Sequence, residues 1–141
     1  MIEISITSKE DVEEIVPRFV YDSEVGLKDR LLDVMPNSAT MRYKGSIIAI
    51  VGFTPLLPGS MEIWGVISNN IKECPKTFHK ACRVVLESFI AQYKLRRVQM
   101  TVSGSFVTGC RWAKSLGFTP EGVLKAYGTD GSDYVMFGRV I

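Results

Sequence analysis

Four side chains that can carry positive charge lie at the start of a long amphipathic segment: Lys76, His79, Lys80 and Arg83. Pro75 comes just before them, and proline is favoured in the first turn of a helix, where its missing N–H is not needed. The free N–H groups of a helix N-terminus bind anions. Cations in a first turn oppose the helix dipole unless an anion lies between them and the amides. The pattern therefore predicts either an anion-binding site or a solvated basic face.

A carboxylate stands upstream of this helix, in a run that is typical of a strand. Residues 61–68 are rich in β-branched and aromatic side chains, and alternation places Glu62, Trp64 and Val66 on one face. Burial beside Trp64 would raise the pKa of Glu62 towards the range of a general base. The alternative is an exposed strand residue without a catalytic role. Gly65 is expected to mark a bulge, or a place where another backbone or a ligand comes close.

Other reactive side chains are few. Cys74, Cys82 and Cys110 show neither a CxxC pattern nor metal-ligand spacing, and His79 is the only histidine, so no metal site is expected. A nucleophilic pair of Cys74 with His79 lacks an orienting third group. Cys82 and Cys110 are expected to be small buried residues on helices.

Length and composition favour one ordinary globular domain, residues 1–141, with 46% hydrophobic and 23% charged residues. The net charge of +2 is too small to suggest nucleic-acid binding, and the short cluster of Lys94, Arg96 and Arg97 follows a predicted helix C-terminus, where cations are favourable. No apolar run reaches the roughly 20 residues that cross a bilayer. Residues 1–4 do not resemble a signal peptide, so we expect a cytoplasmic location without membrane contact.

Hydrophobic periodicity and turn residues set the expected elements. A capping box with Thr7 as the cap and Glu10 as its partner opens the first helix. Lys44-Gly45 forms a two-residue hairpin turn, with 46–53 a central strand covered on both faces, and 55–59 turns the chain into the next strand. Gly117 ends the last helix. The expected strands are 3–7, 39–43, 46–53, 61–68, 97–103, 123–127 and 134–140, and the expected helices are 8–16, 23–34, 75–93 and 107–116.

The order β-α-α-β-β-β-α-β-α-β-β predicts an α/β (α+β) fold, a mixed central sheet of about seven strands flanked by about four helices. The unit 61–103 is expected to be a right-handed crossover between parallel strands. Ligands of such sheets bind beyond the carboxyl ends of the strands, which places residues 66–77 at the site. The long helix is expected to turn one face inwards, formed by Phe78, Ala81, Cys82, Val85, Phe89 and Tyr93.

This order of elements resembles the fold of the GNAT superfamily of N-acetyltransferases. The most specific match is residues 112–118 (WAKSLGF) followed by 120–122 (PEG), which resemble the end of the family's fourth helix and the entry to its sixth strand. Residues 133–137 (DYVMF) resemble its last strand. The resemblance covers nearly the whole chain. It implies an acyl-CoA-dependent N-acetyltransferase that transfers acetyl from acetyl-CoA, as co-substrate, to an amine of a small molecule or a protein.

The resemblance also implies roles for individual residues. Glu62 would be the general base, because several family members carry a glutamate on the fourth strand, and Tyr127 is a candidate proton donor with a packed tyrosine as the alternative. Tyr21 and Asp22, between the first two helices, would line the acceptor site or form a solvated loop. The cofactor would lie in the splay between the fourth and fifth strands and at the helix start, bound by Val66, Ile67, Ser68, Lys76, Thr77, Phe78, His79 and Lys80.

Several family features are missing. The pyrophosphate loop Arg/Gln-x-x-Gly-x-Gly/Ala falls near Cys74, Thr77 and His79, where neither glycine nor the arginine is present. Phe106 stands near the asparagine that often opens the fourth helix. Ala113 takes the place of the tyrosine that often protonates the leaving thiolate. These departures favour the alternative of a catalytically inactive GNAT-like binding or structural protein.

The run 75–78 (PKTF) and the missing glycines resemble divergent GNAT-like proteins encoded by tailed phages, some of which are virion or accessory proteins. That narrower resemblance implies a virion location as the alternative to the cytoplasm. The apolar last strand offers a further expectation, since its edge could pair with a second copy of the chain in a homodimer.

Overall fold

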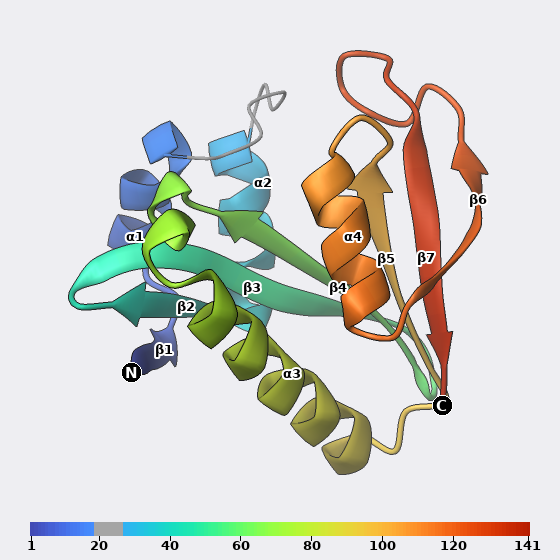
Figure 1. Cartoon of the computed structure of the whole chain (residues 1–141), viewed down its shortest axis with the longest axis horizontal. Helices are drawn as coiled ribbons and strands as arrows, with labels where there is room; N and C mark the ends of the chain where they lie inside the picture. Colours follow the sequence, from blue (N-terminus) through green and yellow to red (C-terminus); the bar gives the residue numbers. More distant parts are fainter. Residues whose placement is uncertain (19–26) are drawn as a thin grey trace.

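The structure is a computed structural model that describes residues 1–18 and 27–141. In that part of the chain, seven strands form one sheet and four α-helices lie against it (Figure 1). The strands are β1 (Ile2–Ile6), β2 (Ser38–Tyr43), β3 (Ser46–Leu57), β4 (Ser60–Ile67), β5 (Arg97–Ser103), β6 (Thr119–Leu124) and β7 (Tyr134–Val140). The helices are α1 (Lys9–Ile15), α2 (Leu27–Val34), α3 (Pro75–Gln92) and α4 (Val107–Ser115), with short 3-10 turns η1 (Val16–Arg18), η2 (Met35–Asn37) and η3 (Asn69–Glu73). The predicted fold class is confirmed.

The sheet consists of two antiparallel parts that meet at one parallel pair of strands. Its order is β1-β2-β3-β4-β5-β7-β6, and the predicted parallel pairing of β4 with β5 is confirmed. That pairing covers three residues of β4, from Ser60 to Glu62. Beyond Glu62 of β4 and Gln99 of β5 the two strands diverge, as Figure 1 shows.

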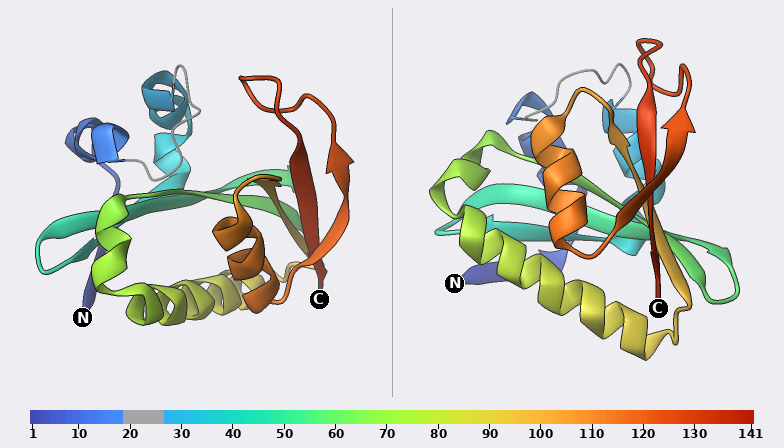
Figure 2. Two further views of the ribbon diagram at one scale, coloured as in Figure 1. Left: turned by 45° about the horizontal axis from the view of Figure 1, so that its top comes forward. Right: turned by 45° about the vertical axis from the view of Figure 1, so that its right-hand side comes forward.

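The helices cover opposite faces of the sheet (Figure 2), with α1 and α2 on one face and α3 and α4 on the other. The core under α1 and α2 is formed by Val12, Ile15, Leu31, Ile47, Ile50 and Val66. On the other face, Met41, Ile48 and Phe78 belong to the core beside α3, and Val98, Ala113 and Phe137 to the core beside α4. Residues 47–50 are all buried, so β3 is the predicted central strand.

The backbone adopts the predicted turn conformations at two places in the chain. Lys44 and Gly45 have φ of 50° and 82°, as a two-residue hairpin turn requires. Gly117, at φ 92°, follows α4 in the left-handed conformation that ends many helices. No helix among the described residues is long and apolar enough to span a membrane.

The capping box of α1 lies one residue later in the chain than predicted. Ser8, not Thr7, is the N-cap, and its hydroxyl accepts from Asp11 N at 3.1 Å while Asp11 Oδ2 accepts from Ser8 N at 2.9 Å. The Thr7 hydroxyl lies 3.2 Å from Thr40 Oγ1 in the protein interior instead. Of the predicted helix 23–34, the described part forms α2; the remainder lies outside the described residues.

Strand boundaries differ from the prediction on three counts. β3 continues through Pro55 to Leu57, which shortens the predicted turn to two residues. β6 is Thr119–Leu124 and not 123–127, because an edge strand tolerates Pro120 and an irregular register beside it. The β3–β4 register passes Gly65 without a shift, so the predicted bulge there is wrong.

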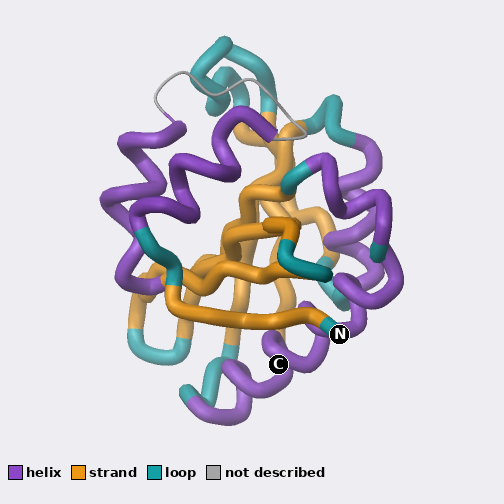
Figure 3. Tube along the Cα trace, turned by 90° about the vertical axis from the view of Figure 1, so that its left-hand side faces the viewer, coloured by secondary structure: helices purple, strands orange, loops and turns teal. Residues whose placement is uncertain are grey.

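The last strand, β7, pairs with β5 on one side and β6 on the other. Its edges are therefore occupied, and the predicted route to a homodimer through this strand is wrong. The outermost strands of the sheet are β1 and β6. Figure 3 looks onto the β1 side of the molecule.

The inward face of α3 is rotated slightly from the predicted one. Its buried residues are Phe78, Cys82, Leu86 and Ile90. Phe89 is half-buried and Tyr93 is 46% exposed. Spacings of three and four residues are satisfied by both sets, so periodicity alone does not distinguish them.

Candidate active site

The candidate site begins where β4 and β5 separate. Ser68 N donates to Ile48 O at 2.9 Å, which fixes this pair as a hydrogen-bonded one. Because such pairs alternate along antiparallel strands, Val66 turns its N–H and C=O towards β3. The N–H and C=O groups of Gly65 and Ile67 point towards β5, but β5 no longer pairs with β4 at these residues. These two residues therefore offer free backbone groups where the resemblance implies the pantetheine contacts.

Two of the predicted cofactor contacts are used within the protein. Val66 is buried in the core under α1 and α2. Ser68 is fully buried, and its hydroxyl accepts from Asn70 N at 3.1 Å. Asn70 also donates from Nδ2 to Ile47 O at 3.1 Å, which fixes the turn η3 against β3. Of the three predicted β4 residues, Ile67 alone turns its backbone towards β5.

β5 presents backbone groups from the opposite side. Gly104 N donates to Asp133 O at 3.0 Å, so even-numbered residues of β5 bond to β7. Thr101 and Ser103 therefore turn their backbones towards β4. Ser103 O accepts from Phe106 N at 3.0 Å and is therefore used within the protein. The divergence leaves the backbone of Gly65 and Ile67 on one side and of Thr101 on the other without a strand partner, and such groups need a partner in water or in a ligand.

The start of α3 offers two free amides. Cys74 N donates to Ile71 O at 3.1 Å, Pro75 has no N–H, and Phe78 N makes the first helical bond, to Cys74 O at 2.9 Å. The N–H groups of Lys76 and Thr77 remain, and no side chain among the described residues caps them. An uncapped helix start of this kind can bind an anion.

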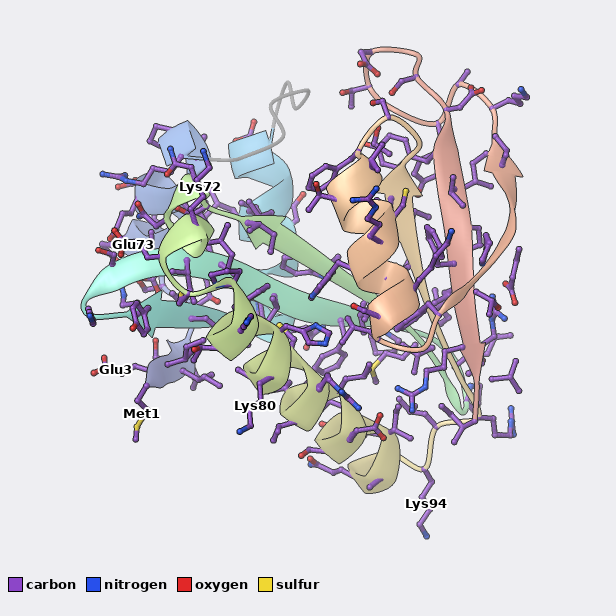
Figure 4. All side chains as sticks on the ribbon, in the orientation of Figure 1. Met1, Glu3, Lys72, Glu73, Lys80 and Lys94 are labelled. Atoms are coloured by element: carbon purple, nitrogen blue, oxygen red, sulfur yellow. The ribbon has the colours of Figure 1, made fainter. Side chains whose placement is uncertain are left out.

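The side chains of the predicted diphosphate contacts point in different directions. Phe78 is 5% exposed and stacks on Trp112 of α4, with ring centroids 5.8 Å apart and 17° between the planes, so its side chain belongs to the core. Lys76 and Lys80 lie two residues either side of Phe78, about 200° away around the helix, and are exposed. Figure 4 shows Lys80 projecting into solvent away from α4. His79 is half-buried.

Glu62 lies in the last paired position of β4, opposite Gln99 of β5. Its side chain is half-buried, and no described residue forms a hydrogen bond or an ion pair with its carboxylate. Burial raises the pKa of Glu62, as the sequence predicts. Alternation with Val66 places Glu62 on the face that carries α1 and α2. A half-buried carboxylate without a partner is what a general base requires.

The structure does not bring Tyr127 beside Glu62. Tyr127 lies in the loop after β6, is 54% exposed, and packs against Tyr134 with ring centroids 5.2 Å apart. Tyr134 pairs with Ser103, four residues beyond Gln99 and therefore roughly 13 Å further along β5. Ala113 is fully buried and has no group that could donate a proton. Tyr21 and Asp22 lie outside the described residues.

Burial disfavours the nucleophilic thiolate form of Cys74 and Cys82. Burial raises the pKa of Cys82 to about 12, and burial is also the main cause of the raised pKa of Cys74. A high thiol pKa means little thiolate at neutral pH. Cys82 is buried, as predicted, whereas Cys110 is half-buried with its thiol 3.7 Å from Ser103 O. The described residues contain no hydrogen bond between Cys74 and His79.

Sequence reasoning missed Gln99 and Thr101 on β5, and it did not distinguish Gly65, whose backbone faces β5, from Val66, whose backbone bonds to β3. Parallel pairing carries no local signal, so the register that sets Glu62 opposite Gln99 cannot be read from either strand alone. Gly65 did stand out as a place of close approach. The alternation of hydrogen-bonded pairs shows which residues of β4 face β5, but it can be assigned only once the β3–β4 register is known.

The sheet order and the separation of β4 from β5 define the GNAT fold. No protein-family model and no curated protein matches the chain. Ard1 from Thermoplasma volcanium superimposes with a TM-score of 0.84 at 16% identity, over 99% of this chain and 97% of that one. A GNAT-family acetyltransferase from Bacillus anthracis gives 0.76 at 14%, covering 99% and 94%.

A third structure of the same fold contains coenzyme A. RimL, a ribosomal L7/L12 α-N-protein acetyltransferase in complex with coenzyme A, gives a TM-score of 0.76 at 12% identity over 99% of this chain and 94% of that one. At such identities the likeness establishes the fold and leaves the activity open. The comparisons give no support to the narrower resemblance to phage-encoded proteins.

Proposed function

We propose that the protein is an acyl-CoA-dependent N-acetyltransferase that transfers acetyl from acetyl-CoA to an amine. The observation that supports this most strongly is the position of Glu62, an unpartnered carboxylate at the point where β4 leaves β5. The uncapped start of α3 follows β4 and the turn η3 in the same strand–turn–helix unit. A base, an open strand edge and an anion-binding helix start are the parts that this reaction needs.

The residues fit coenzyme A, although with fewer contacts than a glycine loop provides. The N–H groups of Lys76 and Thr77 would receive the diphosphate, and the Lys76 ammonium would add a charge-assisted contact. The backbones of Gly65 and Ile67 would pair with the amides of the pantetheine arm. With two free amides at the helix start, we expect weaker cofactor binding than a loop with both glycines would give.

When bound, acetyl-CoA supplies the thioester carbonyl that the amine attacks. Glu62 takes the proton from the amine on the face of the sheet that carries α1 and α2, which leaves the opposite face for the cofactor. The departing sulfur needs a proton, for which Tyr127 remains the proposed donor. The loop that carries Tyr127 would have to approach the separated strands for this role, and Tyr127→Phe tests it.

The acceptor is proposed to be a primary amine of a small molecule or a protein. Structures with this fold include a spermidine N-acetyltransferase and a ribosomal-protein-S18-alanine N-acetyltransferase. A first assay therefore combines acetyl-CoA with spermidine and with peptides that begin with alanine, and measures free thiol and product mass. We expect one acetyl group on one acceptor class. Absence of any acetylated product, together with absence of acetyl-CoA binding at millimolar concentration, would refute the proposal.

A second candidate is a GNAT-like module that binds without catalysis, in the cytoplasm or in a virion. The observations in its favour are the buried Ala113 in place of a proton donor and the Phe78–Trp112 stack, which joins α3 to α4. It predicts that a bound acetyl-CoA would not turn over with any amine. Acetyl transfer that Glu62→Gln abolishes would decide against this candidate.

A further inference from the structure

A cavity of about 380 Å³ lies between α3 and the sheet, away from the residues proposed to bind coenzyme A. Val51, Phe53 and Ile63 line it from the sheet, and Cys82, Val85 and Phe89 line it from α3. The proposed cofactor contacts Gly65, Ile67, Lys76 and Thr77 are not among its lining residues. Trp112 closes it from α4, and the stack of Trp112 on Phe78 lies between this cavity and the start of α3.

The cavity is long, and its lining carries no charge. Its α3 side runs from Cys82 to Tyr93, a rise of about 16 Å along the helix. The described residues that line it include no Asp, Glu, Lys, Arg or His. Ile4 and Tyr93 both line it and are 50% and 46% exposed, so solvent reaches it at these side chains. This shape suits an extended apolar chain better than a compact ring system.

Two hydrogen-bond donors remain unused on residues that line the cavity. Trp64 Nε1 and Trp112 Nε1 are both buried and have no partner among the described residues. Protein atoms cover both nitrogens, so neither N–H faces the open space of the cavity. The two indoles therefore contribute apolar ring surface to the lining, and the ligand is selected by the length of the cavity and by its lack of charge.

We propose that this cavity binds an uncharged, linear, medium-chain aliphatic molecule, as a fatty alcohol provides. Pockets of a few hundred Å³ that are mainly apolar, with a few polar groups, are typical of small-molecule sites. The proposal does not depend on acetyl transfer, and its test is made without coenzyme A. Failure of one proposal leaves the other standing.

The two tryptophans of the chain both line the cavity, so intrinsic fluorescence reports on it directly. The probe is 1-decanol that carries bromine on its last carbon, because bromine quenches indole fluorescence on contact. We expect saturable quenching that unbrominated 1-decanol reverses. Quenching that rises linearly up to the solubility limit, or that 1-decanol does not reverse, would overturn the proposal.

Adjacent valines on α3 provide matched variants. Val85 lines the cavity, whereas Val84 is 61% exposed on the outer side of the same turn. Val85→Phe should fill part of the cavity and weaken probe binding by about tenfold or more, the effect of a lost or blocked apolar contact of ordinary size. Val84→Phe should leave binding unchanged. Equal binding curves for both variants would contradict the proposal.

A measurement on the unaltered protein covers the case in which Val85→Phe does not fold. Cys82 lines the cavity and Cys110 does not, so an uncharged alkylating reagent at alkaline pH compares the two thiols within one sample. 1-Decanol should slow the modification of Cys82 and leave that of Cys110 unchanged, as followed by peptide mass spectrometry. Equal rates for Cys82 with and without 1-decanol would show that the aliphatic chain does not occupy this cavity.

Discussion

Glu62 and Gln99 are the last paired residues of the β4–β5 ladder, and the two strands share no further pairing beyond them. The backbone of Gly65 and Ile67 on one side, and of Thr101 on the other, is thereby left without a strand partner beyond the unpartnered Glu62 carboxylate. Strand separation in the middle of a sheet sacrifices hydrogen bonds, so it needs compensation from water or a ligand. The proposed active site is built on this pair.

Replacement of Glu62 by glutamine should slow acetyl transfer by about 100-fold or more, because general base catalysis contributes about that much. The wild-type rate should fall as the pH drops through the raised pKa of Glu62, since the protonated carboxyl cannot accept a proton. The variant should lose this pH dependence and keep its affinity for acetyl-CoA. Rates measured across pH at saturating substrates provide the check, and an unchanged pH profile would exclude Glu62 as the base.

Charge reversal at the start of α3 should weaken cofactor binding. Lys76→Glu places a carboxylate beside the two free amides, and we expect a loss of about tenfold in affinity for acetyl-CoA, the size of one charge-assisted hydrogen bond. The matched control is Lys94→Glu, which lies at the other end of the helix (Figure 4) and should bind normally. Higher ionic strength should reduce the difference between the two variants. Equal affinities would argue against a diphosphate at this helix end.

Much of this arrangement can be predicted from the sequence, because local signals define most elements. Pro75 marks the start of α3, and Lys44-Gly45 marks the first hairpin. The burial of residues 47–50 follows from their continuous apolar run. Each of these features depends on neighbours in the chain, so composition and periodicity suffice.

The remaining features depend on long-range packing. The register of β4 against β5 decides that Gly65 and Ile67, and not Val66, face the separated strands, and no local pattern sets this register. The sequence pattern places Phe78 both on the inward face of α3 and in the cofactor site. The stack on Trp112, distant in sequence, determines that its side chain lies in the core. The predicted position of β6 is too late in the chain because an edge strand with proline and glycine lacks a strand signal.

The first helix should lose stability in acid through Asp11. Burial raises the pKa of this carboxyl, but hydrogen bonds from Ser8 N–H, Arg42 and Thr40 outweigh it, and the net pKa is lowered below 3.8. A lowered pKa stabilises the fold above the ordinary value, and this contribution is lost as the pH falls through the lowered one. Asp11→Asn should cost about 1–3 kcal/mol at neutral pH.

Urea unfolding at pH 7 and at pH 3 measures both effects. Glu10→Gln is the control, since Glu10 is exposed in the same turn and should change stability by less than about 0.5 kcal/mol. The difference in unfolding free energy between Asp11→Asn and wild type should become smaller in acid. A difference that stays constant with pH would show that the Asp11 charge does not stabilise the helix.

Gly52 should not tolerate a side chain. A Cβ at this position would overlap Trp64 Cζ2 and lie 2.7 Å from Asn37 O, so the indole and the backbone would both have to move. Gly52→Ala is expected to destabilise the fold by about 1–3 kcal/mol, as overpacking does, and to shift tryptophan fluorescence. Gly122→Ala is the control, because nothing lies within 4 Å of its Cβ. Equal unfolding midpoints for the two variants would contradict this packing.

The start of α3 as a receptor for the diphosphate of a thioester cofactor is tested most directly by calorimetry with two ligands. Acetyl-CoA carries the diphosphate, and S-acetylpantetheine shares the thioester arm without it. We predict saturable binding of acetyl-CoA below millimolar concentration, and binding of S-acetylpantetheine weaker by about tenfold or more. No binding of acetyl-CoA at millimolar concentration, or equal binding of the two ligands, would contradict the account.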